Sequence, residues 1–332
     1  MTSRVAGSFV GRWRARWRAW VRFCAETERP TSMALVRIGV GLVLACDFAL
    51  VWSHGVGDVL WGPSTSGAFG LADTLPDAVP VHTLFGASLT TSRAVHAVAF
   101  GSALCLSLGL FSRTSALVAF AASSQLAAIL PQADRGIDTM LRMVLLLLAA
   151  SGAGQALSID AWRRHRTWRP DVRVLAWPRR FLVLQVLWMY FSAGLHKSQL
   201  AWWPAGDFAA LYVVLLDPHF ARADFSGWLS AVYPLTQLGT ASTMLFEVGA
   251  PLMGLSLWFR RTSHRGGRWR ATFAKLRVRE VWLALGIGFH VALMFTIRLG
   301  IFPYGMLALY WAFLTPAEVE ALFARLRRRP SS

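Results

Sequence analysis

Lys197 is the residue whose type and position point most directly to chemistry. It closes a long apolar run that ends AGLHK, and the chain has only one other lysine, Lys275, against 32 arginines. Removal from water disfavours an ammonium ion, and the neutral amine can accept a proton as a general base. Trp202 and Trp203 follow, however, and tryptophans mark the aromatic belt where a membrane helix ends. The residues alone leave two interpretations open, a base and an interfacial anchor.

Glu247 and His290 lie near the middle of two other apolar runs, where a side chain cannot reach water by extending along the helix. A charge at the centre of a bilayer costs roughly 2.5–3.5 kcal/mol on insertion scales, so such residues usually face a protein interior or a cavity. The two residues have either a functional role or a structural one, and neighbouring spans can pair them. His96 is a single imidazole on an apolar face, which is more typical of an interior histidine than of a ligand.

Arg37 and Asp138 are ionisable groups nearer the ends of apolar runs. For Arg37 we expect snorkelling to the interface or a structural salt bridge. Asp138 precedes Arg142 by four residues with the acid first, which favours an ion pair within one helix. Both residues remain candidates for substrate binding, together with Trp203.

Motifs of soluble enzymes and of metal sites are absent from the sequence. It contains no GxGxxG, Walker, HExxH or GxSxG pattern. The three cysteines, Cys24, Cys46 and Cys105, have no CxxC spacing, so neither a disulfide framework nor a zinc site is supported. The spacing of the ionisable groups also predicts no redox metal.

Composition places the chain among membrane proteins. Residues AVILMFWYC make up 55% of 332 positions and charged residues only 15%, so a soluble globule would struggle to hide its apolar surface. The net charge of +17 would suit nucleic acid, but the basic residues lie in blocks between apolar runs. We therefore expect the lipid bilayer as partner, and no nucleic acid.

The apolar runs predict an all-α, polytopic helical bundle of about eight transmembrane helices. A basic amphipathic segment, 1–32, precedes a transmembrane domain, 33–315, and a basic tail, 316–332, follows it. The expected spans lie at 33–53, 91–111, 113–131, 137–153, 180–197, 235–259, 280–299 and 301–315.

Arginine placement predicts the orientation of these spans. The arginine blocks fall in 1–32, at Arg113, in 154–179, in 260–279 and in the tail, whereas the alternate segments hold few basic residues. Basic loops stay on the cytoplasmic side, so both termini are predicted to be cytoplasmic. The abundance of arginine and alanine is typical of a GC-rich bacterial genome and favours the plasma membrane.

An ordered series of segments resembles one known family. It includes ALVRIGVGLVLACD at 34–47, ALSID at 156–160, AGLHKSQLAWWPAG at 193–206, FEVGAP at 246–251 and LGIFPYGMLALY at 299–310. On these segments the chain resembles the horizontally transferred transmembrane domain family, whose best-known relatives are the vitamin K-dependent gamma-carboxylases.

The resemblance implies a role for each candidate residue. Lys197 matches the lysine regarded as the base that deprotonates vitamin K hydroquinone, after which oxygen gives vitamin K epoxide. It implies a carboxylase- or epoxidase-like enzyme of the lyase class, with vitamin K or menaquinone hydroquinone as cofactor. His196, Glu247 and His290 are placed with Lys197 in an outward-facing pocket among spans one, five, six and seven.

Three departures from the carboxylases leave an alternative open. His196 replaces the first lysine of their pair, their Asn-His before the fourth span has no counterpart near Asp138, and no large lumenal domain is expected after Arg329. The alternative is a non-enzymatic accessory or scaffold factor for maturation or export of a secreted peptide. If Lys197, Glu247 and His290 converge on one cavity of about 300–1,000 Å³, chemistry is favoured over scaffolding.

Overall fold

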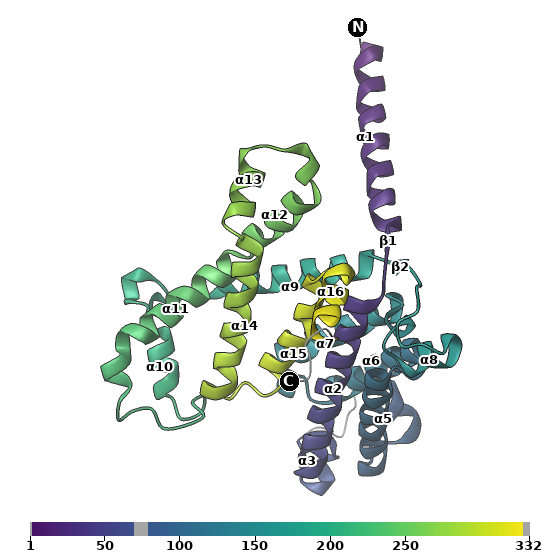
Figure 1. Cartoon of the computed structure of the whole chain (residues 1–332). Coiled ribbons are helices and arrows are strands. Elements are labelled where there is room, and N and C mark those ends of the chain that lie inside the picture. Colours follow the sequence, from purple (N-terminus) through teal and green to yellow (C-terminus); the bar gives the residue numbers. More distant parts are fainter. Residues whose placement is uncertain (1, 70–78, 328–332) are drawn as a thin grey trace. The chain divides into compact units, whose positions relative to one another are not determined.

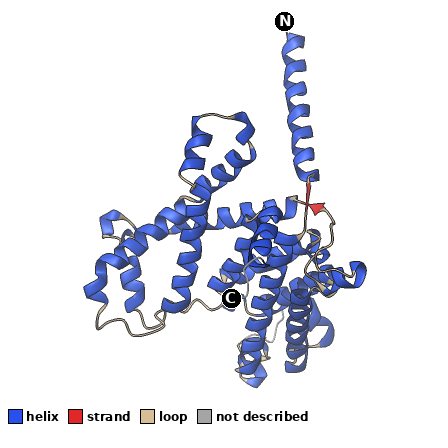
Figure 2. Ribbon diagram, viewed as in Figure 1, coloured by secondary structure: helices blue, strands red, loops and turns tan. Residues whose placement is uncertain are grey.

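The computed structural model describes residues 2–69 and 79–327, and helices are the main secondary structure of this part of the chain (Figures 1 and 2). Backbone contacts divide it into two compact units, the first formed by residues 1–182 and 311–332 and the second by 183–310. Residues 70–78, and residues 328–332 of the predicted tail, lie outside the described residues. The predicted all-α class is confirmed.

The first unit is built on apolar helices that lie side by side (Figure 1). Helix α2 (Thr31–Ser53) packs on α5 (Leu89–Leu108), which packs on α6 (Ser112–Ile129), and α7 (Gly136–Ala150) follows on α6. A Cβ atom at Gly41 would lie 2.6 Å from the backbone nitrogen of Ser107, so only glycine permits this approach of α2 to α5. The remaining helices of this unit are α1 (Thr2–Ala25), α3 (Val56–Trp61), α4 (Pro80–Phe85), α8 (Ile159–His165) and α16 (Pro316–Arg327).

A buried arginine and an aspartate fix the turn between α5 and α6. The guanidinium of Arg37 is fully buried and donates to the carbonyl oxygens of Leu106, Ser107 and Leu157, with distances of 2.7 Å to Ser107 and 2.6 Å to Leu157. It thereby satisfies carbonyls at the end of α5, where a cation also suits the helix dipole. Asp160 accepts from the backbone nitrogen of Ser112 at 2.9 Å and so caps the start of α6.

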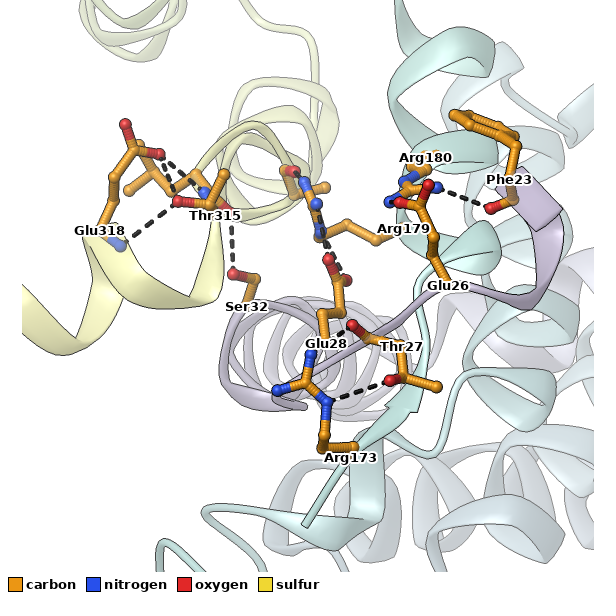
Figure 3. Close-up of polar contacts among 12 residues, drawn as sticks. Phe23, Glu26, Thr27, Glu28, Ser32, Arg173, Arg179, Arg180, Thr315 and Glu318 are labelled. Atoms are coloured by element: carbon orange, nitrogen blue, oxygen red, sulfur yellow. Dashed lines mark hydrogen bonds and ion pairs between the residues drawn. The ribbon is translucent and has the colours of Figure 1, made fainter. Parts of the chain in front are cut away.

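Acid–arginine pairs join the segment that precedes α2 to the segment around residues 179 and 180 (Figure 3). Strand β1 (Thr27–Glu28) pairs antiparallel with β2 (Val174–Leu175). Arg179 contacts Glu28 at 2.7 Å and donates to the carbonyl oxygen of Ala312 at 2.9 Å. At the start of α16, the backbone nitrogen of Thr315 donates to the carboxylate of Glu318 at 2.8 Å and so caps the helix.

The second unit contains most of α9 (Trp177–His196), then α10 (Ala210–Leu216), α11 (Tyr233–Val248), α12 (Ala250–Arg261), α13 (Arg268–Lys275), α14 (Val278–Thr296) and α15 (Phe302–Leu309). Its apolar cluster is formed by four buried residues, Leu215, Leu229, Leu293 and Ile297. The predicted span 235–259 is corrected, because α11 ends before Gly249 and Pro251 lies in the first turn of α12. Proline has no backbone N–H for a continuous helix.

Two described helical segments are long and apolar enough to cross a membrane, Thr31–Ser53 and Arg268–Thr296. A bent pair, Phe302–Phe313 with Pro316–Leu326, gives a third candidate. Helix α7 is shorter than the predicted 137–153, since it ends at Ala150 and its 15 residues rise only about 22 Å. Helices occur at all the predicted spans, but the count of eight crossings stays a prediction.

Candidate functional site

Lys197 and Glu247 form an ion pair within the second unit. Lys197 follows the last residue of α9, and its Nζ contacts Oε2 of Glu247 near the end of α11. The lysine side chain is 19% exposed and the glutamate side chain 6%. A Cβ atom at Gly194 would lie 3.1 Å from the Cβ of Glu247, so the missing side chain lets α9 approach α11 closely. The glycine one turn before Lys197 therefore helps to bring the two charges together.

Two tryptophans of the loop that follows α9 contact Lys197. Lys197 Nζ lies 4.9 Å from the ring centre of Trp202, within the range of a cation–π interaction. The indole nitrogen of Trp203 donates to the carbonyl oxygen of Lys197 at 2.8 Å. Lys197 thus has the aromatic contacts expected of an interfacial anchor. It also has the buried acidic partner expected of a reactive amine.

His290 lies in a separate group of polar contacts in the same unit. It is fully buried, its Nε2 lies 2.5 Å from the hydroxyl of Tyr190, and that hydroxyl lies 3.1 Å from the hydroxyl of Tyr310. Its Nδ1 has no hydrogen-bond partner among the described residues. Aromatic rings surround the group, those of Phe246, Trp282, Phe289 and Phe302.

The proposed pairing of Glu247 with His290 is wrong, because each has a different partner. Glu247 pairs with Lys197, and His290 contacts Tyr190. His196 is exposed, and its Nδ1 lies 2.7 Å from the carbonyl oxygen of Ser192 in its own helix. The structure thus brings Lys197 and Glu247 together, and His196 and His290 have other partners.

Arg37 and Asp138, the two other predicted site residues, belong to the first unit. Arg37 neither snorkels nor forms the expected salt bridge with any described residue, since its buried guanidinium binds carbonyl oxygens. The pair of Asp138 with Arg142 is also wrong. Asp138 accepts from Arg135 at 2.8 Å, and Arg142 binds Asp134 at 2.5 Å. The hydrogen bonds from Arg142 hold the pKa of Asp134 below its usual range.

Sequence reasoning missed four residues that shape contacts in the two units. Tyr190 and Tyr310 are two of only five tyrosines, and both fall in apolar runs, where a buried hydroxyl needs a partner. Gly194 was the available signal for a close helix contact beside Lys197. Asp160 lies in the ALSID segment, and spacing along the sequence does not indicate that it caps α6.

Cavities of about 910, 200 and 380 Å³ are lined by residues other than Lys197, Glu247 and His290. Over residues 2–69 and 79–327, no group of three or more histidine, cysteine, aspartate or glutamate side chains is arranged to hold a metal ion. The Lys197–Glu247 pair lies beside two indoles, and an acid–amine pair can exchange a proton.

Comparison with protein families finds a match to the HTTM domain. The model of the HTTM domain matches residues 26–266, which is most of the chain and includes Lys197 and Glu247 but ends before His290. Neither a curated protein nor a solved structure matches the chain.

Proposed function

Because this chain belongs to the family of HTTM-domain membrane proteins, we propose that it binds a lipophilic weak acid of the hydroquinone class and that Lys197 takes up its proton. The observation that carries the proposal is the Lys197–Glu247 pair, in which both side chains are largely withdrawn from solvent. Lys275, the only other lysine, is exposed. Lys197 is therefore the lysine that we propose as the proton acceptor.

The pair can exchange a proton without help from water. One proton transferred along its hydrogen bond converts the ammonium and carboxylate into a neutral amine and a neutral acid, and low polarity reduces the cost of this transfer. The amine can then accept the hydroxyl proton of a hydroquinone, which leaves a hydroquinone anion beside the new ammonium. Trp203, 39% exposed, is proposed as a flat surface for the ring of the substrate.

The remaining candidates have supporting parts in this proposal. His196 is exposed beside Lys197 and is proposed to carry the proton onward to solvent. His290 is proposed to position α14 through Tyr190. Arg37 and Asp138 act in the first unit through contacts with carbonyl oxygens and with Arg135, and we propose structural roles for both.

Oxidation of a hydroquinone tests the proposal. Purified protein in nanodiscs receives vitamin K or menaquinone hydroquinone under oxygen, and the epoxide is measured; hydroquinone and O₂ give epoxide and one water. We expect epoxide with wild type, none with Lys197→Arg, and wild-type amounts with the matched control Lys275→Arg. Guanidinium is effectively always protonated, so it cannot accept the proton. Unchanged turnover in folded Lys197→Arg would refute the base role.

A second candidate function is a non-enzymatic accessory or scaffold factor for maturation or export of a secreted peptide. It is favoured by the separation of the polar groups, since His290 contacts Tyr190 whereas Lys197 contacts Glu247. Co-purification with a secreted peptide that persists in Lys197→Arg, together with no oxidation of any hydroquinone, would favour this function. Epoxide formation that depends on Lys197 would exclude it.

The proposed location is the plasma membrane, with several crossings and both termini in the cytoplasm. The arginine blocks between the helices support this orientation. Single cysteines introduced at Ser226 and Ser263, in a variant without the three native cysteines, test it in intact cells. A membrane-impermeant maleimide should label the first position, and the second only after lysis.

A further inference from the structure

A basic cavity in the first unit has the features of a site for an anionic group. Its volume is about 910 Å³, and it lies at the start of α6, the end of α7, α8 and strand β2. Arg113, Arg163 and Arg164 line it, against one acid, Asp160. Leu148 and Trp177 line the same cavity. A concave surface with both cationic and apolar parts suits an amphiphile with a negative head.

The acidic residue in the cavity lining, Asp160, is already hydrogen-bonded within the protein. Asp160 accepts from the backbone nitrogens of Phe111 and Ser112 at 3.0 and 2.9 Å and from the Ser112 hydroxyl at 3.1 Å. These bonds cap α6 and leave the charge of Asp160 opposed by the helix start. The three arginines therefore determine the charge that a bound group would meet.

The cavity arginines lack the acid partners that nearby arginines have. In the same unit Arg29, Arg179 and Arg180 each contact one or two carboxylates. Among the described residues, none of the three cavity arginines forms an ion pair. Three like charges around one concavity repel one another, and an anion bound between them would relieve that repulsion.

Other contacts hold two of these side chains at the cavity. The guanidinium of Arg163 lies 5.8 Å from the ring centre of Phe111. Arg164 donates to the side chain of Gln155 at 3.2 Å and to the carbonyl oxygen of Asp160 at 3.1 Å. Guanidinium groups bind phosphate oxygens through paired N–H donors, so partly positioned arginines reduce the entropy that binding costs.

We propose that this cavity binds the phosphate of an anionic phospholipid. The phosphate oxygens are received by Arg113, Arg163 and Arg164, and the glyceride end lies against Leu148 and Trp177. This ligand fits a family of membrane proteins better than a soluble phosphate does, because the apolar lining would remain uncovered by an ion alone. The site is independent of the proposed proton acceptor at Lys197.

Lipid retention in native mass spectrometry tests the proposal on the full-length protein. Samples are exchanged into phosphatidylglycerol or phosphatidylcholine, and bound lipid is counted for wild type, Arg163→Gln/Arg164→Gln, and the matched control Arg265→Gln/Arg268→Gln. The control removes the same charge from exposed arginines that do not line the cavity. We expect wild type to prefer phosphatidylglycerol, the cavity variant to bind it about tenfold or more weakly, and the control to match wild type.

Three results would overturn the proposal. They are equal retention of the two lipids by wild type, an equal loss in the control variant, and unchanged retention in the cavity variant. A third arm with glycerol 1-phosphate separates the sources, since binding as tight as that of phosphatidylglycerol would assign the cavity to a soluble phosphate ester. If the double variant does not fold, as judged by size-exclusion profile, Arg113→Gln is measured in its place.

Discussion

Removal of the charge of Lys197 should destabilise the protein in a pH-dependent way. In Lys197→Met, the carboxyl of Glu247 keeps its burial, with 6% of its side chain exposed, but loses its ion-pair partner. A buried carboxylate without a partner is costly, so the group takes up a proton instead. The cost of that protonation sets the size of the electrostatic loss.

The magnitude follows from the ordinary acidity of a carboxyl group. Protonating a group with a pKa of about 4.3 in water costs about 3.7 kcal/mol at pH 7 and about 1 kcal/mol at pH 5, at about 1.36 kcal/mol per pH unit. Glu247→Met should cost less, about 1–2 kcal/mol, because the lysine left behind is 19% exposed and keeps its contact with Trp202. The double variant should lie within about 1 kcal/mol of wild type, since replacing both charges removes the unpaired group.

A double-mutant cycle measures these differences. The free energy of unfolding is taken from titration with sodium dodecyl sulfate in mixed micelles, followed by circular dichroism, at pH 7 and pH 5. Lys275→Met is the matched control and should leave stability unchanged, because Lys275 is exposed. At pH 7, a loss below about 1 kcal/mol in Lys197→Met, or a double variant as unstable as the sum of the two single variants, would refute the reasoning.

Three further predictions concern the first unit. Arg37→Met removes the donor of the carbonyls at the end of α5 and should cost about 3 kcal/mol in thermal unfolding, with Arg37→Lys regaining only part. Gly41→Val should cost about 1–3 kcal/mol by overpacking, whereas Gly101→Val, with open space around it, should leave the yield of folded protein unchanged. Because the pKa of Asp134 is lowered by Arg142, their pair stabilises the fold above about pH 4 and loses this effect as pH falls through the lowered pKa. Asp134→Asn should therefore cost about 1 kcal/mol at pH 7 and almost nothing at pH 2, in matched unfolding measurements.

Hydropathy predicted the helices well where an apolar run is bounded by turn residues. The first span was expected at 33–53, and α2 covers Thr31–Ser53. Hydropathy failed to predict the break at Gly249 and Pro251. Averaging over an apolar run hides this break, which the missing backbone N–H of the proline causes. Helix ends depend on single residues, and apolar runs do not resolve them.

Charge spacing predicted the wrong partner for Asp138 because a second use of that carboxylate competes. The backbone nitrogen of Arg135, at the start of α7, donates to Asp138 at 2.9 Å and completes a capping box. Arg142 is then free to bind Asp134, eight residues earlier. The i,i+4 ion-pair rule applies to helix interiors. In the first turn of α7, the carboxylate forms the capping interaction instead.

The pairing of Lys197 with Glu247 could not be predicted from spacing, because the residues lie 50 positions apart on different helices. Their burial was predictable from the apolar runs around them. The close approach that joins them depends on Gly194, and one glycine in a long sequence does not identify its neighbour. Sequence thus located the charged groups, and helix packing determined their partners.

Arginine and lysine side chains suit different roles in this chain, permanent contacts for arginine and proton chemistry for lysine. Arg37 and Arg179 bind carbonyl oxygens and carboxylates with a planar group that stays charged, which suits permanent contacts. With 32 arginines in the sequence, a structural ion pair at position 197 had an arginine alternative that the chain uses elsewhere. Lysine differs in that it can lose its proton, and at Lys197 an acid that can exchange a proton lies beside it. The identity of that one residue, set against Glu247, is therefore the strongest argument for proton chemistry in this protein.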